Sequence, residues 1–384
     1  MKIGVVAGEA SGDLLGAGLI RALHERRPDA RFEGIAGPAM VAAGCERWES
    51  SESLAVMGLI EPLVHVPRLL RLRKGLCERW LASPPDVFVG IDAPDFNLGL
   101  EKKLRKNGIK TVHYVSPSIW AWRPGRVHTV RKAVDRVLCI LPFEKPLYDE
   151  HGVDAVFVGH PKADSLPALA DCHAARRQLG IEATEVVAVL PGSRSGEVSR
   201  LGGILADAAM QLASTRPGIH FVTPVATPKL RTMIEQQIDA AGVADSFTLL
   251  DGSSETAMIA ADVVLLASGT AALESALLGK PTIAAYRLAR ITHAIAIGLR
   301  MVKLTHYTLP NLLTETPLVP EFMQENAEPS AIAGAVAEML DDPQRRQMIS
   351  GEFAKLRAEL ALNADQRAAD AVVELAQSQS IHAG

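Results

Sequence analysis

Arg194 is the residue whose type and setting point most directly to a ligand. It lies in the turn Pro191-Gly192-Ser193-Arg194-Ser195-Gly196-Glu197, between a short apolar run at residues 186–190 and a helical pattern at 198–215. A guanidinium offers a planar fork of donors that matches phosphate oxygens, and it keeps its charge at any working pH. The alternative is an ion pair with the nearby Glu197. The turn therefore predicts either a phosphate contact or a local ion pair.

A second turn, Ser268-Gly269-Thr270, opens another helical pattern after the apolar run at residues 263–267. Unpaired amides at a helix N-terminus attract anions, and small side chains let a phosphate approach the backbone. Ser268 or Thr270 can also be a plain N-cap, which is compatible with phosphate binding. Together the two turns predict a site for the diphosphate of a nucleotide-sugar. Glu274, one turn into the helix, either accepts hydrogen bonds from ribose hydroxyls or only complements the helix dipole.

The N-terminal half offers a candidate proton acceptor. The apolar run at residues 87–91 ends in Asp92-Ala93-Pro94-Asp95, which places two carboxylates at a strand tip. An Asp fixed on a strand end can take the proton of a sugar hydroxyl that attacks an anomeric carbon, so we predict that Asp92 is the general base. Asp95 follows a proline and is better explained as a charge that stabilises a helix start.

A glycine-rich turn, Gly8-Glu9-Ala10-Ser11-Gly12-Asp13, follows the first apolar run. We predict that Gly8, Glu9 and Ser11 contact a sugar or acceptor. The alternative is that the glycines only shape the turn and that Asp13 only caps the following helix. His113, within a later apolar run, is predicted to be a buried and hydrogen-bonded histidine rather than a catalyst.

Between residues 54 and 80 the chain is strongly apolar and yet rich in arginine. Apolar side chains beside cations are what an element needs to contact acyl chains and anionic head groups. The alternative, an ordinary core helix with a solvated basic face, is favoured by the residues alone. The candidate membrane or acyl contacts are Val56, Met57, Leu59, Ile60, Val64, Arg68, Leu69, Leu70, Arg71 and Arg73.

Several classes of protein and site are disfavoured. The formal net charge of -4 argues against a nucleic-acid-binding protein. Neither phosphate turn has the glycine pattern of a Walker ATPase or a dinucleotide enzyme, and no His, Cys or Asp cluster has metal-ligand spacing, so we predict no metal and no cofactor. The four cysteines lie far apart, and there is neither a signal peptide pattern nor an apolar run of about 18 residues. We therefore expect a cytoplasmic protein that does not span a membrane.

Strand-like runs alternate with helical patterns throughout, which predicts an α/β protein with parallel sheets. The pattern restarts after a Pro-containing stretch near residues 160–172, so we expect two Rossmann-like domains, at 1–165 and 166–345, whose strand ends face a cleft. Residues 346–384 are predicted to form helices. The predicted strands are 2–7, 31–35, 87–91, 110–115, 137–141, 155–158, 186–190, 220–225, 247–250, 263–267 and 282–285.

These motifs, taken together and in this order, resemble those of the lipid-A-disaccharide synthase family, inverting glycosyltransferases of the two-domain GT-B type. Lys162 departs from the family pattern, in which an apolar residue is expected, and this affects the linker rather than the chemistry. The matching stretches are residues 6–13, 90–97, 114–123 (with Ser116-Pro117-Ser118-Ile119-Trp120-Ala121-Trp122-Arg123), 190–194, 267–274 and 309–313.

The resemblance implies transfer of 2,3-diacylglucosamine from UDP to 2,3-diacylglucosamine 1-phosphate (lipid X), with release of UDP. It implies Asp92 as the base, a required Arg194, and Glu9, Glu274 and Asn311 at the donor site. It also implies peripheral attachment to the inner face of the cytoplasmic membrane of a Gram-negative bacterium, through residues 54–80. Finally, it suggests that the last helices return to the N-terminal domain, with a possible homodimer in which they are exchanged.

Three other functions remain as alternatives. A UDP-sugar 2-epimerase would need no second substrate. A non-enzymatic nucleotide-sugar or lipid-binding protein would not release UDP. An undecaprenyl-linked sugar transferase would use a lipid diphosphate acceptor. The Asp92 turn and the apolar, basic stretch argue against the first two.

Overall fold

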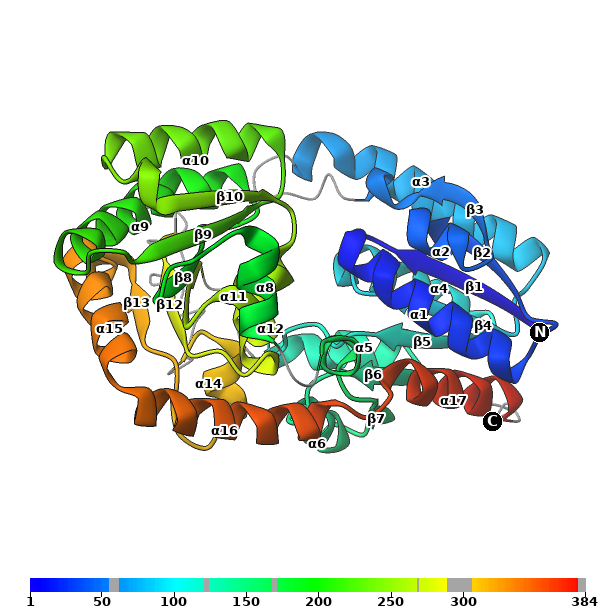
Figure 1. Ribbon diagram of the computed structural model, residues 1–384. Helices are drawn as coiled ribbons and strands as arrows, with labels where there is room; N and C mark the ends of the chain where they lie inside the picture. The colour runs from blue at the N-terminus through cyan, green and yellow to red at the C-terminus, as the bar shows by residue number, and fades with distance from the viewer. Residues whose placement is uncertain (55–61, 121–123, 168–170, 268, 289–305, 379–384) are drawn as a thin grey trace. The chain divides into compact units, whose positions relative to one another are not determined.

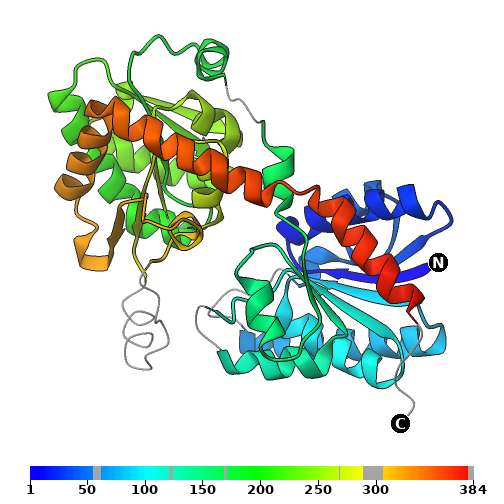
Figure 2. The ribbon, with the colours of Figure 1, turned by 90° about the horizontal axis from the view of Figure 1, so that it is seen from below.

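The computed structural model describes residues 1–54, 62–120, 124–167, 171–267, 269–288 and 306–378. The chain divides into two compact units. Met1–Asp164 and Leu360–Gly384 form the first unit, and Ser165–Glu359 form the second. The chain therefore passes from the first unit to the second and then returns (Figures 1 and 2).

The first unit is built on a seven-stranded sheet with the order β3-β2-β1-β4-β5-β6-β7, and all of its neighbouring strands are parallel. Parallel strands are buried on both faces, which explains why most of these segments are continuous apolar runs. The strands are β1 (Lys2–Ala7), β2 (Arg31–Ala36), β3 (Cys45–Ser50), β4 (Val87–Ile91), β5 (Lys110–Tyr114), β6 (Arg136–Cys139) and β7 (Ala155–Phe157).

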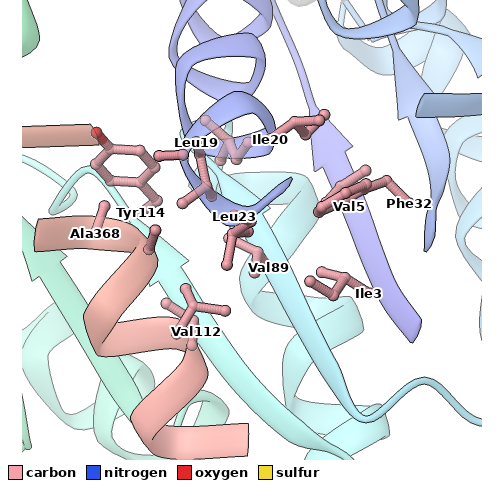
Figure 3. Packing of buried hydrophobic residues seen from close by; sticks show 14 of the residues in the cluster. Ile3, Val5, Leu19, Ile20, Leu23, Phe32, Val89, Val112, Tyr114 and Ala368 are labelled. Carbon is pink, nitrogen blue, oxygen red and sulfur yellow. The ribbon is translucent and has the colours of Figure 1, made fainter. Parts of the chain in front are cut away.

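Alternating side chains of the central strands enter two different cores. Ile3, Val5 and Ala7 of β1 pack in one cluster with α1 (Ala10–Arg26) and α17 (Ala364–Gln377), as Figure 3 shows for the labelled residues. Val6 points the other way, into a cluster formed with α3 (Pro62–Ala82) and α4 (Pro94–Lys106). This two-residue period is that of a β-strand, so the sheet is covered by helices on both faces.

The remaining helical segments of the first unit are short. They are α2 (Pro38–Ala42), η1 (Ser51–Ser53), η2 (Pro124–Arg126), α5 (Val127–Ala133), α6 (Glu144–Asp149) and α7 (Pro161–Ser165), which ends at the boundary with the second unit.

The second unit repeats the design with a six-stranded sheet, in which every pair of neighbouring strands is again parallel. Its strand order is β10-β9-β8-β11-β12-β13, so the strands that precede the two predicted phosphate turns, β8 and β11, lie side by side. The strands are β8 (Val186–Leu190), β9 (His220–Val225), β10 (Phe247–Asp251), β11 (Val263–Ala267), β12 (Thr282–Tyr286) and β13 (Glu321–Met323).

Helices flank this second sheet, and α9 packs against both α10 and α15. The helical segments are α8 (Cys172–Leu179), α9 (Ser195–Thr215), α10 (Pro228–Ala240), η3 (Ala244–Ser246), α11 (Ser254–Ala260), α12 (Thr270–Leu277), α14 (Leu309–Leu313), η4 (Gln324–Asn326), α15 (Pro329–Asp341) and α16 (Pro343–Leu360).

The end of the chain divides differently from the prediction. Helix α17 packs against α1, as expected, whereas residues 346–359 of α16 belong to the second unit. The guanidinium of Arg357 in α16 donates to the carbonyls of Leu166 and Pro167, which ties this helix to the start of the second unit. Only the last helix therefore completes the first unit.

Candidate active site

The turn after β8 exposes the guanidinium of Arg194. Gly192 adopts a φ of +120° and lies so close to Glu197 that an added Cβ would be 2.7 Å from the Glu197 Cβ, which only glycine permits without strain. Glu197 folds back over the turn, and its carboxylate accepts the amides of Ser193 and Arg194 at 3.2 and 3.3 Å. The predicted ion pair of Arg194 with Glu197 is present at 3.4 Å, yet the Arg194 side chain remains 74% exposed. The guanidinium is therefore accessible to a ligand.

The turn after β11 leaves the start of α12 open. Gly269 is the N-cap residue, and no side chain caps the helix among the described residues. A Cβ added at Gly269 would meet no atom within 4 Å, so there is room for a group to approach the backbone. Ser268, the third residue of the predicted phosphate turn, lies outside the described residues. Ala272 N donates to Gly269 O at 3.2 Å, and the preceding amides at the start of α12 are thus available to an anion.

The two turns meet because their strands are neighbours. Leu190 at the end of β8 pairs with Leu266 of β11, so Arg194 and Thr270 follow strand ends that are adjacent in the sheet. Parallel strands lie about 4.8 Å apart, which brings both turns to one small region of the sheet edge. A second cation joins them, because Arg200 of α9 donates from Nε to the carbonyl of Arg287, just beyond the end of β12. Nothing in the sequence pattern singled out Arg200.

Glu274 and Asn311 occupy positions that differ in accessibility. Glu274 is half-buried in α12 and already has an interaction within the protein. Asn311 is 5% exposed and its amide is fully used: Nδ2 donates to Val319 O and Glu321 Oε1, and Oδ1 accepts the amides of Leu318 and Val319. Asn311 therefore shapes the loop that precedes β13, and its predicted direct contact with a donor would require these bonds to break.

Glu321 was not predicted as a site residue. Its carboxylate accepts hydrogen bonds from the Thr308 amide and hydroxyl, the Tyr307 amide and Asn311 Nδ2. It thereby fixes the start of α14, which packs against α12. No local sequence pattern predicts this role of Glu321, because its partners lie 10 to 14 positions away in the chain.

In the first unit, Asp92 lies in a strained backbone turn. Asp92 and Ala93 have φ values of +52° and +43°, and Val115, at the end of the adjacent strand β5, has a φ of +76°. Left-handed conformations are costly for residues with a Cβ, above all for a β-branched valine, and such strain concentrates at functional sites. The Asp92 amide donates to Tyr114 O at 2.9 Å, so the two strained strand ends are linked directly.

A buried amide holds this turn in place. Asn97 of α4 is fully buried, and its Nδ2 donates to Asp92 O at 2.8 Å and, at 3.4 Å, to the carbonyls of Val6 and Ile91. The half-buried carboxylate of Asp92 itself forms no hydrogen bond or ion pair with a described residue. The turn is therefore fixed by its backbone, while its carboxylate remains available to a reactant.

A buried ionisable pair lies one turn further along α4. His113 and Glu101 are both 0% exposed and their Nδ1 and Oε1 atoms are 2.7 Å apart, so His113 is buried and hydrogen-bonded as predicted. Burial raises the pKa of Glu101, and the neighbouring His113 opposes that rise. Glu101 Oε2, His113 Nε2 and Asn97 Oδ1 have no hydrogen-bond partner among the described residues. Buried polar groups without partners are costly to stability.

The turn after β1 lies beside the Asp92 turn. Ala7 of β1 pairs with Ile91 of β4, and a Cβ added to Gly8 would be 2.4 Å from the Cβ of Ala93, so Gly8 permits this close approach. Glu9 and Ser11 are exposed at the start of α1. The structure thus brings Gly8, Glu9 and Asp92 together at the ends of neighbouring strands.

Asp13 and Asp95 have structural partners. Asp13 accepts the amides of Gly37, Ala39 and Met40 at 2.9 to 3.0 Å, so it caps α2 and not its own helix, because α2 begins beside α1. Asp95, in the first turn of α4, forms an ion pair with Arg126. Its place in the first turn is the one predicted for a charge that stabilises a helix start.

The described part of the apolar and basic stretch lies on α3, which turns some of its side chains toward the core and others toward the solvent. Leu69 packs against the core cluster of α3 and α4, whereas Leu70 is 49% exposed beside the exposed Arg68 and Arg71. Arg73 is half-buried. The candidate contacts Val56, Met57, Leu59 and Ile60 lie outside the described residues, and so do Trp122 and Arg123; the side chain of Val64 is likewise not described. Within the described residues, no helix is long and apolar enough to cross a membrane.

Trp120 contacts an unusual carboxylate. Its Nε1 donates to Glu144 Oε1 at 3.3 Å, and its ring packs edge-on against Phe143 at 5.1 Å. Burial raises the pKa of Glu144 to about 7, against the opposing effect of hydrogen bonds from Leu141 and Trp120.

In the described parts of the chain, no group of three or more His, Cys, Asp or Glu residues could hold a metal ion.

The comparison with known proteins decides between the alternatives. The family described as lipid-A-disaccharide synthetase matches residues 3–374. The lipid-A-disaccharide synthase of Xanthomonas campestris pv. campestris (strain 8004) is 47% identical over 385 residues, covering 100% of this chain and 88% of the relative. The chain belongs to the lipid-A-disaccharide synthase family. The synthase of Xylella fastidiosa (strain M23) is 46% identical, over 98% of this chain and 99% of its own length.

Membership in the lipid-A-disaccharide synthase family makes the chain a glycosyltransferase of lipid A biosynthesis, as the sequence motifs predicted. Solved structures share only its fold. A glycosyltransferase from Rickettsia africae ESF-5 has a TM-score of 0.59 and 14% identity, covering 98% of this chain and 99% of its own. UDP-GlcNAc 2-epimerase from Neisseria meningitidis, bound to UDP-GlcNAc, has a TM-score of 0.60 and 13% identity with the same coverage. The epimerase alternative therefore rests on a distant likeness of fold, and the predicted two-domain GT-B fold is confirmed.

Proposed function

We propose that the enzyme transfers 2,3-diacylglucosamine from UDP to the 6-hydroxyl of 2,3-diacylglucosamine 1-phosphate, with inversion at the anomeric carbon. The acceptor oxygen forms the new bond to that carbon as its proton passes to Asp92. The bond from the anomeric carbon to the diphosphate breaks, and its electron pair leaves with UDP. The two units carry separate roles, which can be tested separately.

The role of Asp92 as base is supported by its setting. The carboxylate is partly exposed, is not engaged by a described residue, and is carried on a strained turn that Asn97 and Tyr114 hold by its backbone. A fixed carboxylate with free oxygens can accept a proton without first breaking an interaction, and general-base catalysis of this kind contributes about 10²–10⁴-fold.

Asp92→Asn tests this role with little disturbance of the backbone, since Asn tolerates the left-handed conformation well. We expect kcat to fall by about 10²–10⁴-fold while the affinity for UDP is unchanged. Asp86→Asn is the matched control, because the exposed Asp86 precedes β4 at the opposite end of the strand and accepts the Lys2 amide. An Asp92→Asn enzyme that keeps more than a few per cent of wild-type turnover would remove Asp92 from the reaction.

The diphosphate role is supported by the single observation of two adjacent open turns in the second unit. The exposed guanidinium of Arg194 and the uncapped start of α12 follow neighbouring strands. A bidentate guanidinium and free amides are the two donor types that stabilise charge on a departing diphosphate, at about 3–4 kcal/mol for each fixed donor in other enzymes.

Arg194→Ala is therefore expected to weaken UDP binding and turnover together, each by about 10²-fold. Arg177→Ala is the control, since Arg177 is an exposed arginine of the same unit on α8. Titration of the full-length protein with UDP and an assay of UDP release give the two quantities. Wild-type values of both in Arg194→Ala would count against the diphosphate site.

Peripheral membrane attachment is a further part of the proposal. Val66 and Leu70 are exposed apolar residues one turn apart on α3, flanked by the exposed Arg68 and Arg71. This combination suits the boundary between acyl chains and anionic head groups. Co-sedimentation with phosphatidylglycerol vesicles should decrease in Leu70→Glu and be unaffected in Met348→Glu, an equally exposed apolar residue of the second unit.

The proposal also includes a homodimer, whose mass by light scattering would be twice the 41.0 kDa of one chain.

Incubation with the UDP-sugar alone should yield neither epimerised sugar nor UDP, because the reaction needs the second lipid.

A further inference from the structure

An open groove lies along α4 from Pro94 to Lys102, entirely within the first unit. Its volume is about 660 Å³, and its walls come from one face of α4 and from the segment formed by η2 and the start of α5. The groove begins at Pro94 and Asp95, in the helical turn that directly follows Asp92 and Ala93. Three residues of extended chain span at most about 11 Å, so the groove opens close to the proposed base.

The groove carries an excess of positive charge. Lys102 lines it, is exposed, and forms no ion pair within the described parts of the protein. Arg126 lines it from η2, with a side chain that is 19% exposed, and is paired with the more exposed Asp95. The guanidinium has five donors, so the pair with Asp95 leaves part of its capacity unused.

A third cation, Arg73 of α3, lies against Gly99, one of the residues that line the groove. A Cβ added to Gly99, which lines the groove, would lie 2.2 Å from Nη1 and 2.8 Å from Cζ of Arg73. The absence of a side chain at Gly99 therefore lets the Arg73 guanidinium rest on the surface of α4. Arg73 likewise has no carboxylate partner among the described residues. Three cations and one carboxylate, Asp95, leave a formal charge of about +2.

This charge matches one particular chemical group. A phosphate monoester carries about −1.5 to −2 charges at pH 7 and has three strong acceptor oxygens. Guanidinium and ammonium groups bind it through charge-assisted hydrogen bonds. Thr129 contributes a hydroxyl to the wall.

We propose that this groove binds the phosphate monoester of the acceptor sugar through Lys102, Arg126 and Arg73, and so directs the acceptor hydroxyl toward Asp92. The inference rests on the proposed function, because it takes a sugar phosphate as acceptor and Asp92 as base. It adds to that function a specificity for the phosphate.

The test compares two acceptors, diacylglucosamine 1-phosphate and the same lipid without its phosphate, in detergent micelles. The wild-type enzyme should prefer the phosphorylated acceptor. Lys102→Gln and Arg73→Gln should each raise the KM for the phosphorylated acceptor about 10-fold or more, leave the donor KM unchanged, and change turnover of the other acceptor little. Asp95→Asn should have the opposite sign and lower the acceptor KM, because it removes the competing negative charge.

Lys103→Gln is the control, since Lys103 is the next exposed residue of α4 and does not line the groove. An unchanged preference for the phosphorylated acceptor in both Lys102→Gln and Arg73→Gln would overturn the proposal. Vesicles containing phosphatidylglycerol provide a second arm. If the two variants lose only vesicle binding and keep the acceptor preference, the cations bind membrane head groups and the proposal is wrong.

A binding measurement separates the groove from the proposed reaction. Soluble glucosamine 1-phosphate should bind the full-length protein more tightly than glucosamine, and Lys102→Gln should remove most of the difference. If this holds while the enzyme fails to turn over either lipid acceptor, the reaction is wrong and the groove stands. If both soluble sugars bind equally in the wild-type protein, the groove assignment fails.

Discussion

Asn97→Ala tests whether the buried Asn97 amide holds the proposed base, Asp92, in position, because it leaves the Asp92 carboxylate itself unchanged. The substitution removes the 2.8 Å hydrogen bond to Asp92 O and the two 3.4 Å bonds to Val6 O and Ile91 O. A carbonyl that loses its partner in a partly buried site costs about 1–3 kcal/mol. The left-handed conformations of Asp92 and Ala93 each hold a similar amount, about 1–3 kcal/mol, which can be released once the turn is no longer fixed.

Relaxation of this turn displaces the Asp92 carboxylate. A shift of about 1 Å costs on the order of 10²-fold in rate, which corresponds to about 2.7 kcal/mol and is comparable to the strain available. We therefore expect kcat for UDP release to fall about 10–100-fold. The affinity for UDP should not change, because its proposed site lies in the second unit.

Asn107→Ala is the matched control for this prediction. Asn107 follows the same helix, and its exposed amide donates to Lys103 O at 2.8 Å, far along α4 from Asp92. Thermal unfolding of both variants verifies that the first unit remains folded. A folded Asn97→Ala enzyme with kcat within about twofold of wild type would refute the reasoning that the buried amide positions the base.

Two further predictions concern stability. Asp13→Ala should lower the free energy of unfolding of the first unit by about 3–5 kcal/mol in urea titrations, because three amides at the start of α2 lose a charged acceptor. Asp13→Asn should lower it less. If Asp13→Ala lost activity at unchanged stability, Asp13 would instead belong to the reaction. Glu144 has a pKa of about 7 in the folded protein against an ordinary value of 4.5, so its stabilising contribution is present below about pH 4.5 and is lost as the pH rises through 7. Glu144→Gln should therefore gain stability relative to wild type between pH 5 and pH 8, by about 3.4 kcal/mol at most. Parallel pH profiles for the two proteins would contradict this.

The sequence predicted the central strands well and the edge strands poorly. The predicted ends of β1, β4, β8 and β11 coincide with those observed, because these strands are continuous apolar runs covered on both faces. Strand β3, with the sequence Cys-Glu-Arg-Trp-Glu-Ser, was not predicted, because an edge strand exposes every other side chain and so resembles a polar loop. The three-residue β13, at the edge of the second sheet, was missed for the same reason.

Some groupings of candidate site residues could be predicted from the sequence, and others could not. Parallel topology alone brings the Arg194 and Thr270 turns to one sheet edge, and the Gly8 and Asp92 turns to another, so these groupings could be predicted from strand ends. The roles of Asn97 and Glu321 depend on hydrogen bonds to distant segments, which leave no local signal.

Helical phase explains another difference. Leu69 and Leu70 are equally apolar in the sequence, and only their positions around α3 decide that one faces the core and the other the solvent. The strained φ values at Asp92, Ala93 and Val115 were also beyond reach, because none of these residues is a glycine.

The packing of α17 on α1 sets an order for the synthesis of the protein. Ala368, Ala369, Val372 and Leu375 are buried in the core of the first unit, and Arg26 of α1 pairs with Asp370. The ribosome makes these residues only after the whole of Ser165–Glu359. At about 5–20 residues per second, roughly 200 residues take about 10–40 s.

During that interval the apolar face of α1 that α17 will cover is present on a nascent chain that lacks its partner helix. The second unit, whose residues are contiguous, can fold while the first waits. Of the two units, the one whose translation begins earlier is thus finished later, and a chain cut after Glu359 would have an intact second unit and an incomplete first one.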